Sequence, residues 1–243
     1  MSTGHCFAFA GFSDAEWYCI LGLKEGDKTG LGQVLSFRHG ERLANVLRKR
    51  YKDPWFLPAI PDCLNTLPGF AEGQIDWWLG RNNINLVAYE RDRVLDYLAR
   101  DAGLYPLIRE FQNHRTTLVG PEPLRAFAPK LGARFVAIET PNLHLQPGGI
   151  EKAVGRILRE VRRGDAVAIS AGVSAAIIID MILDREQEHW LWDCGSIWDA
   201  FVGIGGQRQW RADLYADPIK LHLWQHQNLT GERVYSAIYH QCT

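Results

Sequence analysis

Two carboxylates spaced two residues apart follow an apolar run near the start of the chain. The stretch FAFAGFSDAEWY covers residues 7–18, and Asp14 and Glu16 come directly after a predicted strand over 7–12. Carboxylates at a strand end can hold a divalent cation against a diphosphate, and one of them can act as a general base. Ser13 and Glu16 also match the capping box, in which the serine caps a helix and the glutamate reaches back to it. The two roles can coexist, because a capped helix start also attracts anions.

A turn of small residues forms a second candidate site within AVAISAGVSAAIIIDMI, residues 166–182. Here an apolar strand is followed by Gly172, Val173 and Ser174 and then by a helix pattern. Small side chains at such a turn let backbone N–H groups approach a phosphate, with help from the helix N-terminus. The turn lacks G-x-G-x-x-G and Walker A, so neither a classical dinucleotide site nor a P-loop is supported. An ordinary strand-to-helix turn is the competing interpretation.

A third candidate lies in WLWDCGSIWDAFVG, residues 190–203. Asp193 follows a predicted strand, and Gly195 and Ser196 supply a turn with free donors. An acidic residue at a strand end can bind ribose hydroxyls, a base edge or a metal. A lone aspartate in such a loop also serves as a helix cap. Its functional interest therefore depends on whether it lies beside the second candidate.

The elements that must position these residues alternate between strand and helix patterns. Strands are predicted over 116–119, 135–138, 166–169 and 190–192, with helices over 121–131, 150–161 and 174–183 and a C-terminal cap at Gly164. This alternation predicts an α/β fold: a Rossmann-like, mostly parallel sheet with helices on both faces. Ligands of such sheets bind beyond the carboxyl ends of the strands, where all three candidates fall.

The first hundred residues are mixed in pattern. A strand is predicted over 7–12 and another over 84–88, an extended segment over 55–60, and helices over 14–23, 41–50 and 91–100. We expect a single domain over 1–243, in which lobes 1–108 and 109–243 share a cleft. The pattern after residue 206 predicts no definite element.

Composition narrows the classes of protein. The chain has 243 residues, 47% hydrophobic and 23% charged, which is typical of a soluble globular protein. A net charge of -1 provides no overall field to hold DNA, so no DNA partner is expected. No run approaches the roughly 20 apolar residues that span a bilayer. The five scattered cysteines form no C-x-x-C pair, which favours reduced thiols and a cytoplasmic location. The oligomeric state stays open.

Taken together, these stretches make the chain resemble the GT-D glycosyltransferases, a bacterial family that acts on nucleotide sugars. The family motif R-F-G-D-G-E matches residues 11–16, where this chain has GFSDAE. The four later motifs of the family match, in order, residues 119–122, Pro141 with Asn142, 170–175 and 193–196. Order and spacing hold over roughly residues 7–203, most of the chain.

The resemblance implies a sugar-nucleotide site in which Asp14 and Glu16 form the catalytic D-x-E pair and hold a divalent metal, Mn²⁺ or Mg²⁺. It implies transfer of a sugar, with a UDP-hexose as the preferred donor, to a glycan or other hydroxyl acceptor. The remaining residues assigned to donor binding are Phe12, Ser13, Gly120, Asn142, Gly172, Val173, Ser174, Asp193, Gly195 and Ser196. Trp17, beside the acidic pair, is a candidate stacking platform for the substrate.

The chain also departs from the family pattern. Gly11 stands where the family has arginine, a phosphate or carboxylate partner, so the donor preference stays open. Another glycan-modifying transferase, such as a pyruvyl or phosphosugar transferase, is an alternative. A non-catalytic nucleotide-binding module of the same fold is a second alternative, which Gly11 favours.

Overall fold

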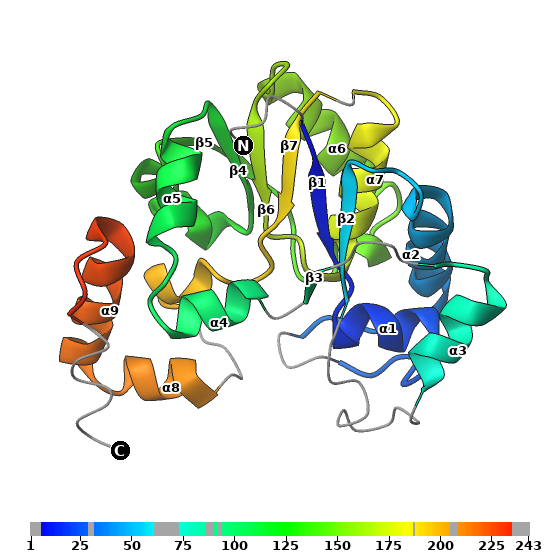
Figure 1. Cartoon of the computed structure of the whole chain (residues 1–243), viewed down its shortest axis with the longest axis horizontal. Helices are drawn as coiled ribbons and strands as arrows, with labels where there is room; N and C mark the ends of the chain where they lie inside the picture. The colour runs from blue at the N-terminus through cyan, green and yellow to red at the C-terminus, as the bar shows by residue number, and fades with distance from the viewer. Residues whose placement is uncertain are drawn as a thin grey trace.

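The described residues form one parallel sheet with helices around it (Figure 1). The computed structural model describes residues 6–28, 32–60, 73–85, 90–91, 94–186, 188–204 and 209–234. Within them, the seven strands are β1 (Ala8–Gly11), β2 (Phe56–Ile60), β3 (Glu90–Arg91), β4 (Thr116–Gly120), β5 (Ala133–Ala137), β6 (Ala166–Ile169) and β7 (Trp190–Asp193). Their order in the sheet is β3-β2-β1-β7-β6-β4-β5, and every pairing among them is parallel. The predicted α/β, Rossmann-like fold is therefore confirmed.

The sheet joins the two halves of the chain through its central pair of strands. β1 pairs with β2 on one side and with β7 on the other, where Ala8 lies opposite Leu191 and Phe9 opposite Trp192. Central strands of this kind are apolar because both of their faces are buried, and β6 is buried at every position. Residues from before and after 108 thus share one continuous sheet.

One face of the sheet is covered by helices from both halves of the chain. The helices of the described residues are α1 (Asp14–Ile20), α2 (Phe37–Arg50), α3 (Gln74–Arg81), α4 (Val94–Arg100), α5 (Tyr105–Gln112), α6 (Gly149–Glu160), α7 (Ala175–Leu183), α8 (Gln209–Tyr215) and α9 (Pro218–Thr230). Side chains of α1, α2, α6 and α7 pack with the sheet in one large apolar cluster. α6 contributes its buried stripe of Ile150, Ala153, Val154 and Ile157, which confirms the helix that its periodicity predicts.

The opposite face carries a second apolar cluster built from α4, α5, α8, α9 and the segment after β7. Trp198 and Trp224 are fully buried in it. The chain therefore leaves β1 toward one face, through α1, and leaves the neighbouring β7 toward the other. Adjacent strands whose connections diverge in this way open a crevice at their carboxyl ends, which is where Rossmann-like sheets bind ligands.

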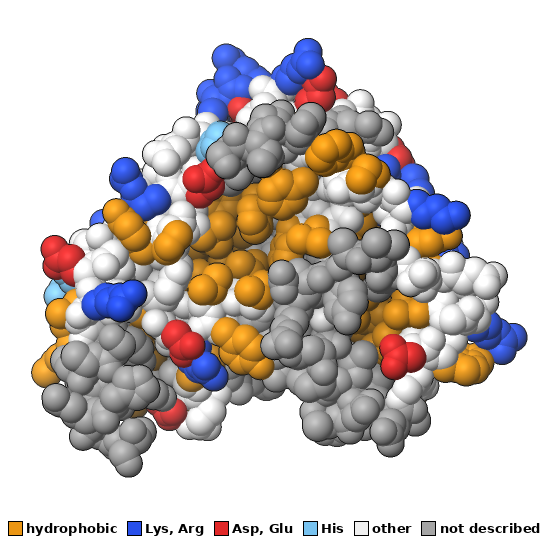
Figure 2. Space-filling view, in the orientation of Figure 1, with side chains coloured by type: hydrophobic (Ala, Val, Ile, Leu, Met, Phe, Trp, Pro, Cys, Tyr) orange, Lys and Arg blue, Asp and Glu red, His pale blue; other side chains and the backbone are white. Residues whose placement is uncertain are grey.

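Among the described residues, no helix lies over part of this second face. Figure 2 shows hydrophobic side chains gathered in front of the central strands, between the helices on either side. Phe7, Leu57 and Trp192 are among the partly buried side chains of this cluster. Phe7 contacts Trp192 edge to face, with ring centroids 5.0 Å apart.

Three predicted elements differ from the structure. The segment predicted as a helix over 121–131 forms two 3-10 helices, η2 (Glu122–Ala126) and η3 (Ala128–Leu131), because prolines at 121, 123 and 129 remove backbone N–H donors. The helix over 14–23 ends at Ile20, before Gly22 adopts a positive φ of 65°. α6 is capped by Val161 rather than by Gly164, which sits in the following turn.

Two further predictions concern less regular segments. Of the strand predicted over 84–88, residues 84–85 lie outside any strand, residues 86–88 lie outside the described residues, and β3 follows at Glu90–Arg91. The C-terminal segment, for which the sequence pattern predicts no element, forms α8 and α9. Asp217 caps α9 by accepting from the backbone N–H groups of Ile219 and Lys220. Among the described residues, every helix is too short or too polar to span a membrane.

Candidate functional site

A cavity of about 1040 Å³ opens at the carboxyl edge of the sheet, the lower edge in Figure 1. It brings together most of the three candidate stretches that lie far apart in the sequence. The predicted site residues that line it are Ser13, Asp14, Glu16, Gly172, Asp193, Gly195 and Ser196. The structure thus gathers the acidic pair, the small-residue turn and the turn after β7 around one space.

Other predicted site residues lie outside the walls of this cavity in the described structure. They are Phe12, Gly120, Asn142, Val173 and Ser174. Phe12 is fully buried in the core. A Cβ on Gly120 would approach the Leu124 side chain at 2.8 Å, so this glycine permits close packing behind the cavity. Trp17, the candidate stacking platform, is also fully buried and packs edge to face on Trp78, so that interpretation is wrong.

Ser13 and Glu16 form the capping box that their spacing predicts. The carboxyl Oε2 of Glu16 accepts hydrogen bonds from the Ser13 N–H at 3.0 Å and from the Ser13 hydroxyl at 2.8 Å. These bonds draw Glu16 back over the start of α1, where only 6% of the residue is exposed. Asp14, two residues earlier in the same helix, is exposed on the cavity wall. The same two acids therefore differ sharply in environment.

Asp193 is fixed at the end of β7 by backbone donors on both sides. Its Oδ2 accepts from the Gly11 N–H and its Oδ1 from the Gly195 N–H, each at 3.0 Å. A Cβ on Gly11 would lie 2.9 Å from Asp193 Oδ2, which is closer than real Cβ contacts. The glycine that departs from the family motif thus leaves room for Asp193 between β1 and β7.

Burial raises the pKa values of Glu16 and Asp193 well above those of exposed carboxyl groups. The pKa of Glu16 is raised to about 8, mainly by desolvation and then by the nearby Asp193 and Asp14 charges, while the Ser13 hydroxyl opposes the increase. Desolvation raises the pKa of Asp193 to about 7, against the two backbone N–H groups that favour its charged form. Buried acids with displaced pKa values in a cleft are a physical signature of a functional site.

Asn142 has a structural role in this structure. Its Oδ1 accepts from the Val34 N–H at 2.8 Å, and its Nδ2 donates to the Gly32 carbonyl at 3.1 Å. It therefore fastens the segment between α1 and α2 to the loop after β5. Val173 is likewise turned away from the cavity: its carbonyl hydrogen-bonds to the buried His39 ring at 2.8 Å.

The turn after β6 is partly covered by that same segment. Gly172 has a positive φ of 53°, and a Cβ there would overlap the side-chain amide of Gln33. The Oγ of Ser170, which lines the cavity and is 6% exposed, has no hydrogen-bond partner within the described residues. The Oγ of Ser174, at the start of α7, also has none there. Both hydroxyl oxygens are buried, and of these two serines only Ser170 lines the cavity.

Several cavity residues were missed from the sequence. Arg211 of α8 is 1% exposed and donates to the Ser196 carbonyl and hydroxyl, each at 2.8 Å. It also lies 3.4 Å from a carboxyl oxygen of Asp199, whose pKa burial raises to about 6. Lys24 and Lys28 line the cavity from the segment after α1. No local motif marks these basic residues, because only the fold brings them to the acids.

The site has carboxylates that could bind a metal ion, but the described residues do not supply a complete set of metal ligands. Among the described residues, no group of three or more His, Cys, Asp or Glu side chains is arranged to hold a metal ion. Asp14 lies on the cavity wall, and negative charges repel one another around Glu16. Such a site suits a cation that is bound by one or two carboxylates and whose remaining ligands are substrate phosphates. The donor set therefore fits the expected Mn²⁺ or Mg²⁺ only with a bound phosphate ligand.

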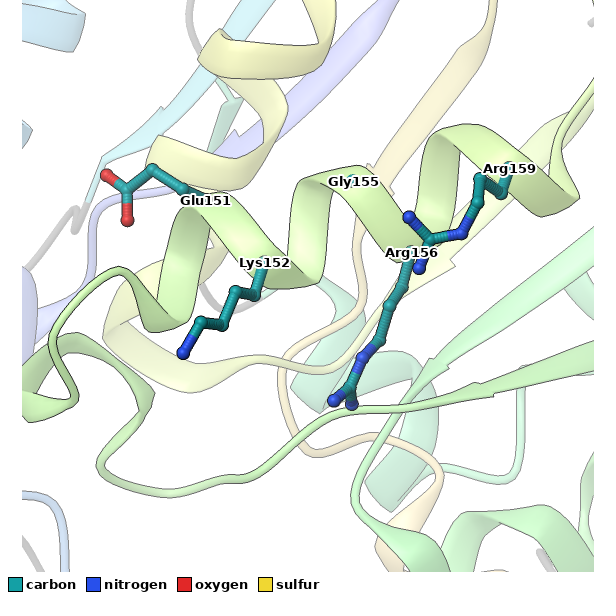
Figure 3. A pocket seen from close by; sticks show the side chains of 5 residues that line it. All are labelled: Glu151, Lys152, Gly155, Arg156 and Arg159. Carbon is teal, nitrogen blue, oxygen red and sulfur yellow. The ribbon is translucent and has the colours of Figure 1, made fainter.

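A second, smaller depression of about 420 Å³ lies along α6 (Figure 3). Its lining residues are Glu151, Lys152, Gly155, Arg156 and Arg159. Lys152 and Arg156 extend from the same side of the helix, while Glu151 points away from them and pairs with Arg42. This depression belongs to a single helix and holds none of the predicted site residues, so it is a solvated helix face.

Comparisons with protein-family models, with curated proteins and with solved structures gave no match to this chain.

Proposed function

We propose that this chain is a glycosyltransferase that moves a hexose from a uridine-diphosphate-type donor to a hydroxyl group of a glycan acceptor. The observation that carries the proposal is the cavity of about 1040 Å³ at the crevice between β1 and β7, with Glu16 and Asp193 buried on its wall. Ligand pockets commonly measure roughly 300–1,000 Å³, and Rossmann-like sheets bind nucleotides at such a crevice. The order of motifs shared with the GT-D family supports the same assignment.

In the proposed reaction the acceptor oxygen bonds to the anomeric carbon of the donor sugar. The bond from that carbon to the phosphate oxygen breaks, and the nucleoside diphosphate leaves with its electron pair. Glu16 takes the proton of the acceptor hydroxyl, because a pKa raised to about 8 lies close to working pH, where a general base is most effective. Asp193 and Ser196 orient the bound sugar from the end of β7.

Asp14 completes the proposed site from the exposed side of the cavity. With the phosphate oxygens of the donor, it would hold the divalent cation, which neutralises negative charge on the leaving diphosphate. Ser170 lines the same cavity, and its buried hydroxyl has no hydrogen-bond partner among the described residues, so a small rotation would let it donate to the substrate.

The experiment is donor hydrolysis and thermal unfolding with a panel of nucleotide sugars, with and without Mn²⁺. A ligand that binds only the folded protein raises the unfolding midpoint by mass action. We expect one nucleotide-diphosphate sugar to raise it and to be hydrolysed slowly. The D14N/E16Q double variant should reduce hydrolysis at least 100-fold, whereas Glu160→Gln, an exposed change on α6, should leave it unchanged.

Three outcomes would contradict the proposal. Full activity in the D14N/E16Q variant would remove the acidic pair from the chemistry. A product whose mass increases by a pyruvyl or phosphosugar group would assign a different glycan-modifying transferase. Binding of a nucleotide without any metal-dependent hydrolysis would indicate the non-catalytic module.

A further inference from the structure

The segment between α1 and α2 forms a small hairpin on the wall of the cavity. We call it the lysine hairpin and define it as residues 24–28 and 32–35. Gly26 N–H donates to the Leu35 carbonyl and Leu35 N–H to the Asp27 carbonyl, and Lys28 bridges Val34 in antiparallel fashion. Its position is therefore set by backbone pairing as well as by side chains.

Contacts from distant parts of the chain fix this hairpin to the body of the protein. Asn142 holds the backbone of Gly32 and Val34, and the His144 ring hydrogen-bonds to the Val34 carbonyl at 2.8 Å. Gln33, 6% exposed, lies over Gly172 at the turn after β6. A loop held at this many points presents its side chains to the cavity in a defined place.

The hairpin supplies two of the cationic side chains that line the cavity. Lys24 and Lys28 both line it, and neither forms an ion pair with any residue that the structure describes. The third cation on the wall, Arg211, is engaged with Ser196 and Asp199. The hairpin also places Asp27 on the cavity wall, so its side of the cavity carries two lysines against one aspartate, while the buried acids Glu16 and Asp193 lie on the strand side.

Lys24 is held in a backbone conformation that lysine rarely adopts. Its φ is 55°, in the left-handed region, which costs a residue with a Cβ about 1 kcal/mol. Its ammonium group lies 4.2 Å from the centre of the Tyr18 ring, another cavity residue. Strained positions of this kind gather at ligand sites, where the side chain rather than the backbone preference is retained.

We infer that the lysine hairpin binds the diphosphate group of the ligand, with Lys24 and Lys28 as its charged contacts. The ligand class is a molecule with two linked phosphates, as in a nucleoside diphosphate. This inference rests on the proposed function and deepens it. It also provides the cationic partner that Gly11 does not supply at the end of β1.

The test uses inorganic diphosphate as the probe, measured by calorimetry on the full chain in the presence of EDTA, so that no metal contributes. The unmodified protein should bind it with an affinity that falls as salt is raised. Lys24→Gln and Lys28→Gln should each weaken binding about fivefold to tenfold. Lys152→Gln, which removes an exposed lysine from the α6 depression, is the matched control and should change affinity less than twofold.

Each result bears on the inference. Unchanged affinity in both hairpin variants, or loss of binding in Lys152→Gln instead, would overturn it, as would absence of binding to the unmodified protein. Because both lysines are exposed, the two variants should fold normally, and thermal unfolding curves of the variants check this. A protein that binds diphosphate through these lysines but responds to no nucleotide sugar would retain the inference while contradicting the proposed function.

Discussion

At the scale of single residues, the site depends on Gly11 and Asp193 sharing a narrow space. The strands β1 and β7 run side by side with Phe9 opposite Trp192, and the Asp193 side chain reaches along the strand end to accept a hydrogen bond from the Gly11 N–H. Asp193 occupies the space that a side chain at position 11 would fill. The buried aspartate therefore requires a residue without a side chain at position 11.

Replacing Gly11 by alanine should therefore destabilise the protein. The new Cβ would meet Asp193 Oδ2, while the other oxygen of this carboxyl group, Oδ1, accepts a hydrogen bond from the Gly195 N–H. We therefore expect a loss of about 1–3 kcal/mol in the free energy of unfolding. Gly155→Ala in the middle of α6 is the matched control. Its nearest neighbour would be an Arg159 nitrogen 3.8 Å away, and alanine there should stabilise by about 0.5–1 kcal/mol.

Urea denaturation of both variants measures these changes directly. Equal stability of Gly11→Ala and the unmodified protein would show that Asp193 is free to move away. The close approach would then have no energetic importance.

At the scale of elements, the lysine hairpin shows how a loop can become part of a site. Its own sequence is polar and rich in glycine, and its backbone bonds are few. Asn142 and His144, from the loop after β5, provide the contacts that place it beside the strand ends. Asn142 is thus a positioning residue, and its predicted contact with the substrate is replaced by contact with the hairpin.

Asn142→Ala should loosen the hairpin while leaving the sheet intact. We expect hydrogen exchange at the Val34 amide to become about tenfold faster, and the affinity for inorganic diphosphate to fall roughly threefold. Asn142→Asp, which keeps the acceptor for Val34 but loses the donor to Gly32, should give an intermediate result. Gln146→Ala, in the same loop but bonded to Glu139, is the control and should leave Val34 unaffected.

Unchanged exchange at Val34 in Asn142→Ala would contradict the positioning role. A general increase across the strands would instead indicate loss of global stability, which the exchange rates of β6 amides would reveal.

At the scale of the whole molecule, the buried acids connect the site to the pH dependence of stability. Burial raises the pKa of Glu16 to about 8 and that of Asp193 to about 7 in the folded state, well above the values of unfolded chains. The folded protein then binds more protons than the unfolded one between about pH 4 and 8. Stability from these groups is full below that window and is lost as pH rises through 7 and then 8.

Glu16→Gln should remove much of this loss, because an amide keeps an acceptor for Ser13 and does not ionise. We expect the variant to resemble the unmodified protein at pH 5 and to be more stable by about 2 kcal/mol at pH 9. The free energy of unfolding in urea at pH 5, 7 and 9 gives the comparison, with Glu160→Gln as an exposed control. Parallel curves for the two proteins would show that Glu16 ionises normally.

The sequence by itself determined the layered α/β fold. The alternation of apolar strand patterns with a 3.6-residue stripe such as that of α6 is a local signal, and a parallel sheet needs helices between its strands. The strand-end location of Asp14, Glu16 and Asp193 follows from the same pattern, as does the capping box at Ser13. In residues 121–131 the helix pattern conflicted with the prolines. The helix prediction failed there because proline has no backbone N–H to donate to the helical hydrogen bonds.

Only the tertiary structure decided which of these residues meet. Gly11 and Asp193 are 182 positions apart, and Val34 and Asn142 are 108 apart, so no local pattern links either pair. The sheet order placed β7 beside β1, and burial then raised the pKa values of Glu16 and Asp193. Lys24, Lys28 and Arg211 likewise reached the cavity through loop and helix packing, since a charge becomes part of a site only when the chain folds it against its partners.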